Sequence, residues 1–190
     1  KTDRENYEKY WDDISPFIKF GCLKDEKFDE KMKDYILYKN LDGKYLTLAD
    51  CLEENKEKHE NKIFYVTDEK EQSQYINMFK EEGKNAVILK HNIDSPFISH
   101  LEMKNEKIRF QRIDADLTED FVESTDAEAL KETTDSLTEI FRKALNNDKL
   151  EVKVEKMKNE NISSMITLSE ESRRMQDMMK MYSMGGSFDA

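Results

Sequence analysis

The sequence predicts an α/β protein, α+β as a whole, from three observations. Helical apolar stripes open the chain, and apolar runs of strand length then alternate with helical patterns. After an acidic stretch, the pattern changes to a helix, two alternating segments and a methionine-rich helix. We therefore expect helices, then a three-layer βαβαβ unit, then a smaller unit of helix, β-hairpin and amphipathic helix.

The first element is expected to be a helix that begins near Arg4. Apolar residues recur there every three or four positions, as Tyr7, Tyr10, Trp11, Ile14, Phe17 and Ile18. This spacing is typical of a helix with one buried face. Pro16 is expected to kink the helix or begin a second one, and Gly21 to end it.

A second helix is expected over residues 27–38, followed by a turn at 40–43. Thr47 then has the side chain of an N-cap residue. It predicts a third helix that continues to about Lys58.

Three strands are expected at 62–67, 86–89 and 107–113. The run at 86–89 is continuously apolar, as in strands that are buried on both faces. Between the first two strands, Asp68 is expected to cap a helix that stops at Gly83. Because strands and helices alternate, the sheet is expected to be parallel.

The helix between the second and third strands is expected to open at Ser95-Pro96. Ser95 would be its cap and Pro96 its first helical residue, where proline needs no N–H partner. The helix would run to about Met103.

An acidic connector is expected at 114–126 (DADLTEDFVESTD), which contains six acidic and no basic residues. It would separate a first unit, 1–113, from an incomplete second unit, 127–190. The hairpin strands of the second unit are expected at 150–154 and 164–168.

Composition excludes several classes of function. The chain has 31 Lys and Arg against 42 Asp and Glu, a net charge of −11, which disfavours nucleic acids and anionic membranes as partners. No apolar run is long enough to span a bilayer. Cys22 and Cys51 lack metal-type spacing and are expected to be free thiols in a reducing cytoplasm. Because the chain opens with Lys1 and a charged helical pattern, it is expected to be a fragment of a longer protein.

No residue pattern points to catalysis. His59, His91 and His100 have no carboxylate or cysteine at metal-ligand spacing. The only adjacent glycines, Gly185 and Gly186, follow a helix instead of opening one, so they do not form a phosphate-binding loop. The residues therefore predict a non-enzymatic chain with no catalytic residue, metal or cofactor.

The segment 173–186 (RRMQDMMKMYSMGG) has five methionines in fourteen residues. On a helix, one stripe collects Leu168, Met175, Met178, Met179 and Tyr182. That stripe would suit a core, in which case the helix packs on the hairpin or on a part outside this chain. Met181 and Met184 fall outside the stripe, and methionine adapts well to irregular partners. A surface for other proteins is therefore the second interpretation.

The order of several segments resembles a known family. Residues 7–21 (YEKYWDDISPFIKFG), 47–67 (TLADCLEENKEKHENKIFYVT), 79–89 (FKEEGKNAVIL) and 173–186 are similar, in this order, to the ninety-kilodalton heat-shock chaperones. The similarity is to the bacterial branch, high-temperature protein G (HtpG), and it covers nearly the whole chain.

The resemblance implies the end of the family's middle domain at 1–113 and the start of its C-terminal domain at 127–190. It implies a stress-response chaperone as the parent protein, which is cytoplasmic, homodimeric and driven by ATP and magnesium. The ATP-binding domain, the loop with the ATP-contacting arginine and the dimerisation helices would lie outside this chain. The chain alone is expected neither to hydrolyse ATP nor to dimerise tightly.

The resemblance also implies contact with unfolded or partly folded client proteins. The residues expected to make it are Met175, Met178, Met179, Tyr182 and Phe97. Ser95 and Pro96 depart from the acidic residue and tryptophan of many bacterial relatives, which leaves Phe97 as the nearest aromatic. Leu37 replaces a family arginine.

Two other classes of function stay open. The chain could be an adaptor whose methionine helix binds one folded partner. Alternatively, it could be an enzyme domain with a site at the carboxyl ends of the three strands, near Asp68 and His91.

Overall fold

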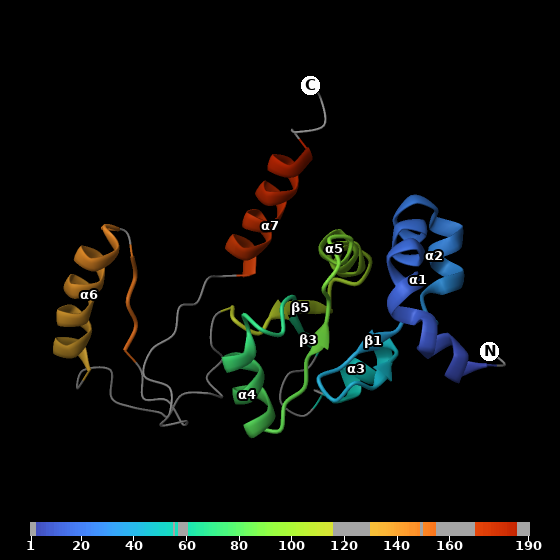
Figure 1. Ribbon diagram of the computed structural model, residues 1–190, viewed down its shortest axis with the longest axis horizontal. Coiled ribbons are helices and arrows are strands. Elements are labelled where there is room, and N and C mark those ends of the chain that lie inside the picture. The colour runs from blue at the N-terminus through green and yellow to red at the C-terminus, as the bar shows by residue number, and fades with distance from the viewer. Residues whose placement is uncertain are drawn as a thin grey trace. The chain divides into compact units, whose positions relative to one another are not determined.

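A parallel sheet organises the first of two compact units in this computed structural model (Figure 1). The structure describes residues 3–54, 56, 61–115, 130–148, 150–154 and 170–185. In the last range, side chains are described for 170–175, Met178 and Met179. The first unit combines Lys1–Asp116 with Thr167–Ala190, and the second is Leu117–Ile166.

The sheet has the order β4-β3-β5, with β3 (Lys62–Val66) between β4 (Val87–Ile88) and β5 (Arg109–Arg112). Both neighbours run parallel to β3, which confirms the expected parallel βαβαβ arrangement. The strands are shorter than the predicted ranges 62–67, 86–89 and 107–113. The mixed helix and strand content confirms the predicted α/β class.

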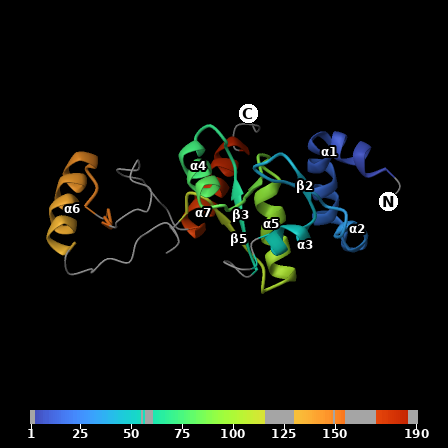
Figure 2. The ribbon, with the colours of Figure 1, turned by 90° about the horizontal axis from the view of Figure 1, so that it is seen from below.

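Two helices cover opposite faces of this sheet (Figure 2). Neighbouring residues of a strand point to opposite faces. Phe64 packs edge-on against Phe79 of α4 (Ser73–Glu81), at a ring distance of 4.9 Å. Tyr65 instead joins the main core with Phe97 of α5 (Asp94–Lys104).

The main core continues into α1 (Arg4–Lys24) through Trp11 and Cys22. The expectations that Pro16 begins a second helix and that Gly21 ends the first are wrong, because the helix runs through both residues to Lys24. The alternative, a kink at Pro16, stays a prediction. Asp25 marks the boundary, since its carboxylate accepts from the N–H groups of the next helix, α2 (Glu26–Met32).

The expected helix over 27–38 is also too long. After α2, residues Ile36–Tyr38 are consecutively buried, which suits an extended chain better than a helix with one buried face. They lead into β1 (Tyr38–Lys39), which pairs with β2 (Tyr45–Leu46) across the expected turn. Gly43 in that turn has φ of 79°, a conformation that favours glycine.

The start of the first helix near Arg4 is confirmed, and the predicted N-cap residues are correct in one of three cases. Thr47 caps α3 (Leu48–Glu54), and its hydroxyl accepts from the Asp50 N–H. Asp68 caps a turn that precedes α4 instead of the helix itself. Ser95 does not cap α5, because the helix already begins at Asp94 and its N-cap residue is Ile93, which makes no side-chain cap bond.

The second unit contains α6 (Lys131–Leu145), which confirms the helix expected after the acidic stretch. Residues 151–154 are described and form no strand there, whereas the expected partner 164–168 lies outside the described residues. The last helix, α7 (Glu170–Gly185), groups with the first unit. The compact units thus differ from the expected division into 1–113 and 127–190, which stays a prediction about the family's domains.

Candidate functional site

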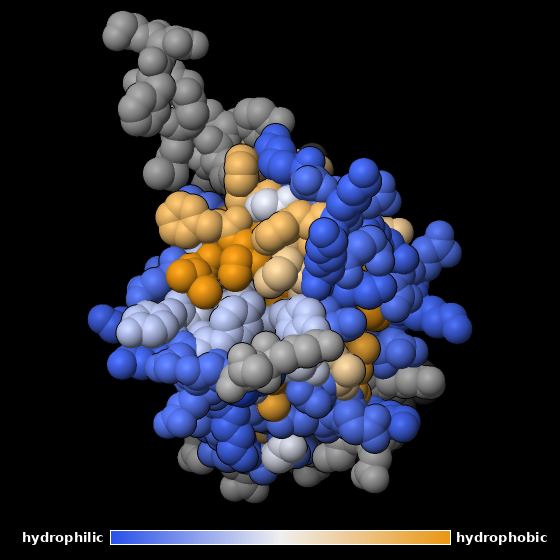
Figure 3. Space-filling view, turned by 90° about the vertical axis from the view of Figure 1, so that its right-hand side faces the viewer, coloured by the Kyte–Doolittle hydropathy of each residue, from blue (hydrophilic) through white to orange (hydrophobic). Residues whose placement is uncertain are grey.

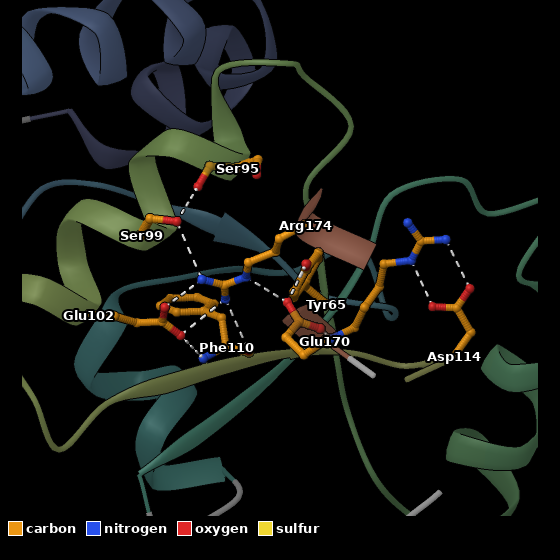
Figure 4. A network of polar contacts seen from close by, with 9 residues as sticks. Tyr65, Ser95, Ser99, Glu102, Phe110, Asp114, Glu170 and Arg174 are labelled. Carbon is orange, nitrogen blue, oxygen red and sulfur yellow. Dashed lines mark hydrogen bonds and ion pairs between the residues drawn. The ribbon is translucent and has the colours of Figure 1, made fainter. Parts of the chain in front are cut away.

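The first turn of α7 is attached to the sheet through Arg174 (Figure 4). Its guanidinium holds Glu102 of α5 with both terminal nitrogens, at 2.6 Å and 3.1 Å. Its Nε donates to Glu170, one helical turn earlier, at 2.8 Å. Burial works against the charged form, but the hydrogen bonds to Glu102 and Glu170 raise the pKa of Arg174 above its ordinary value. This arginine therefore stays charged at every physiological pH.

Glu170 makes the second attachment. One carboxylate oxygen accepts from the Tyr65 hydroxyl at 2.7 Å, and the other accepts from the backbone N–H of Arg112 at 2.8 Å. Burial, followed by the nearby Glu170 charge, raises the pKa of Tyr65, which therefore remains a neutral donor.

These contacts close one edge of the sheet. β5 is an edge strand, and its residues 110 and 112 turn their backbone groups away from β3. Glu102 accepts from the Phe110 N–H at 2.6 Å, and Arg174 donates to the Phe110 carbonyl at 3.1 Å. Side chains thus satisfy groups that an additional strand would otherwise pair with.

A second ion-pair group lies at the carboxyl end of β5. Asp114 accepts from Arg112 at 2.7 Å and 2.9 Å, and Arg173 Nη2 lies 3.2 Å from the same carboxylate. Burial opposes the charge of Asp114, yet the hydrogen bond from Arg112 holds its pKa below the ordinary value. Arg173 and Arg174 are therefore both paired with acids.

Beyond this anchored turn, α7 presents apolar side chains to solvent. Met175, Met178 and Met179 are 57%, 55% and 65% exposed. Three of the expected client-contacting residues therefore share an accessible surface, which we call the methionine surface. The side chain of Tyr182 lies outside the described residues.

Phe97 does not join this surface. It is 1% exposed and packs in the main core beside Ile98 and Tyr38. In this conformation it offers nothing to a partner, so its expected role in client contact is corrected to a role in the core.

An apolar surface that the sequence analysis missed lies on α1 (Figure 3). Phe17, Phe20 and Tyr10 are 79%, 54% and 51% exposed. The helical spacing predicts Tyr10 and Phe17 in the buried stripe, and this prediction is wrong. The buried face is instead formed by Trp11, Ser15, Lys19 and Cys22, which follow helical spacing but include two polar residues.

A cavity of about 190 Å³ lies where β4 ends, between α1 and the start of α5. His91 lines it, together with the buried ion pair of Lys19 and Asp94. Asp68 is not among its lining residues and bonds to the backbone of its own turn. The cavity therefore does not bring together the two residues expected for an enzyme site.

His100, the other described histidine, takes part in contacts between two helices. His100 Nε2 lies 2.9 Å from the buried Asp29 carboxylate, which Lys104 also contacts at 2.7 Å. These contacts join α5 to α2. His59 lies outside the described residues. Among the residues that the structure describes, no group of three His, Cys, Asp or Glu side chains is placed to hold a metal ion.

Cys22 and Cys51 are free and buried, as expected for reduced thiols. Burial is the main reason that the pKa of each rises to about 12. Both therefore lack the thiolate character of a nucleophile. Within the described part of the chain, no helix is long and apolar enough to cross a membrane.

Comparison with known proteins identifies the family of this chain. The sequence profile of the family described as "Hsp90 protein" matches residues 1–188. "Chaperone protein htpG" of Bacteroides fragilis (strain YCH46) is 34% identical over 191 residues. "Chaperone protein HtpG" is 32% identical over 189 residues in Bacteroides thetaiotaomicron and 29% over 193 in Porphyromonas gingivalis.

The aligned regions cover 94% to 95% of this chain but only 28% of each relative. The chain thus spans little more than a quarter of the length of these relatives. Their names agree with the bacterial branch that the sequence resembles. With a family match over nearly all its residues, the chain belongs to the Hsp90 protein family of chaperones.

Proposed function

We propose that this chain contributes a binding surface for unfolded or partly folded client proteins to an ATP-driven chaperone. The observation that carries the proposal is the exposure of Met175, Met178 and Met179 on one helix. ATP and magnesium come from the family resemblance, and we assign them to no residue of this chain.

The chemistry of methionine supports a surface for varied partners. The side chain is unbranched and polarisable, so it can pack against differently shaped apolar groups. Leaving three of them in water forgoes a burial free energy of roughly 1.5–3 kcal/mol each. A client segment that covers them would recover part of that free energy.

The experiment replaces Met175 and Met179 with serine and measures binding of a fluorescently labelled, permanently unfolded polypeptide. We expect the Kd to rise at least about tenfold, since each buried methionine contributes roughly 1.5–3 kcal/mol. The melting temperature should stay nearly unchanged, because both side chains are more than half exposed.

Met103→Ser is the matched control. Met103 is likewise an exposed methionine (75%), but it belongs to α5 and not to the methionine surface of α7, so its replacement should leave client binding intact. Unchanged binding in the double variant would refute the proposal, and a large loss of melting temperature would show that the methionines pack in the fold. Tight binding of one folded partner without affinity for unfolded chains would favour the adaptor.

A further inference from the structure

The open edge of β5 is the place where α7 meets the sheet. The N–H groups of Arg109 and Ile113 bond toward β3 at 2.9 Å and 3.0 Å. Alternate residues of a strand direct their backbone N–H and C=O groups to opposite sides. The backbone groups of Phe110 and Arg112 therefore point away from β3. The Arg112 N–H is bonded by Glu170 of α7, at 2.8 Å.

Charge and burial make this attachment specific. Arg174, Glu102 and Glu170 have side chains that are 21%, 14% and 21% exposed. Partly buried, charge-assisted hydrogen bonds are stronger and less screened by salt than those of exposed pairs. Each carboxylate bonds both to Arg174 and to the strand backbone, so losing the arginine removes a partner from both acids.

The attachment lies next to the methionine surface. Met175 follows Arg174 directly, and Met178 lies one helical turn further along α7. A helix is stiff over this distance. The point at which its first turn is fixed therefore sets where Met175, Met178 and Met179 lie relative to the sheet.

We propose that Glu170 and Arg174 are positioning residues that clasp α7 to the edge of β5 and so hold the methionine surface in its binding orientation. This inference rests on the proposed function. We call the contacts of Glu170 and Arg174 with the β5 edge the clasp. When these contacts are broken, the methionines of α7 no longer have a fixed position relative to the sheet. Apparent affinity then falls with the fraction of molecules in which the clasp is closed.

The experiment compares Arg174→Ala with the full chain by amide hydrogen exchange and by binding of the labelled unfolded polypeptide. The Arg112 amide should exchange about tenfold faster, because its acceptor leaves with α7. The Arg109 and Ile113 amides, which bond toward β3, should keep their protection. If the closed fraction falls to about a tenth, the Kd rises about tenfold.

Lys143→Ala is the matched control, since it removes an exposed pair with Glu139 on α6 and should change neither readout. Arg174→Lys keeps the charge without the two-pronged geometry and should recover only part of the binding. Should Arg174→Ala fail to fold, Glu170→Gln decides the question, because it keeps an oxygen acceptor but removes the charge.

An unchanged Arg112 amide would overturn the clasp. Faster exchange of that amide with unchanged client affinity would overturn the positioning role while leaving the proposed function intact. If the full chain itself binds no unfolded polypeptide, the proposed function fails, and the positioning role fails with it. Faster exchange at Arg112 alone, together with weaker binding and an unchanged melting temperature, supports the inference.

Discussion

Lys19 and Asp94 form the most deeply buried ion pair among the described side chains, each 4% exposed. The Lys19 ammonium also lies 6.0 Å from the centre of the Tyr38 ring and 5.7 Å from that of Phe97. Asp94 accepts a further hydrogen bond from the His91 N–H. The pair thus connects α1 to the start of α5, and each charge is compensated inside the protein.

We expect Lys19→Met to lower the free energy of unfolding by about 3–5 kcal/mol, because Asp94 would remain buried without its cation. Adding Asp94→Asn should recover most of that loss, since the amide oxygen can still accept from His91 without a charge. Urea unfolding followed by fluorescence of Trp11, which is buried nearby, measures both variants.

The control for this pair is Lys143→Met, in which the lost partner is exposed and the expected change stays within about 0.5 kcal/mol. If Lys19→Met were equally mild, Asp94 would have to take up a proton or reach water. The contribution of the pair would then be small.

At the scale of elements, the sheet could be predicted from the sequence because its strands have recognisable local residue patterns. The runs at 62–67 and 86–89 are apolar enough to be buried on both faces, and the intervening helix signals imply parallel strands. The structure confirms both strands and their direction.

The orientation of α1 could not be predicted, for a physical reason. Lys19 and Ser15 lie on its buried face, while Phe17 faces solvent. Lys19 can be buried only because Asp94 supplies a counter-charge from a distant part of the chain, and helical periodicity carries no information about such a partner. The candidate site shows the same limit, because the local sequence around Arg174 does not indicate that Glu102, a distant residue, is its partner.

Pro16 offers a test of α1 as an element. It lies within the helix, where it lacks the N–H that would bond the carbonyl of Asp12. Pro16→Ala should therefore raise the free energy of unfolding by about 1–3 kcal/mol, measured by urea unfolding. Pro96→Ala is the control: Pro96 lies in the first turn of α5, where the N–H has no helical partner, so little change is expected. A loss of stability in Pro16→Ala would mean that the packing of α1 depends on a kink at Pro16.

At the scale of the whole molecule, the described side chains of α7 contact the rest of the first unit through polar groups, and none of these described side chains belongs to the core. The buried apolar residues of that unit all precede residue 116 among the described residues, whereas α7 contributes Glu170, Arg173 and Arg174. The apolar core and the polar attachment of α7 are therefore formed by different residues. The described core lies in the sheet and the helices that precede α7, and α7 adds Glu170 and Arg174 to the coverage of the β5 edge.

A chain that ends at Ile166 should therefore still fold, with a melting temperature within a few degrees of the full chain. Its β5 edge would lose Glu170 and Arg174 and expose backbone groups that can pair with another molecule. Light scattering should show more association for the chain that ends at Ile166 than for a control chain that ends at Gly185. The control keeps α7 and differs from the full chain only in lacking residues 186–190. Unfolding of the shorter chain would place α7 within the cooperative core. An equally dispersed, folded chain would mean that Glu102, which holds the Phe110 N–H, protects the edge by itself.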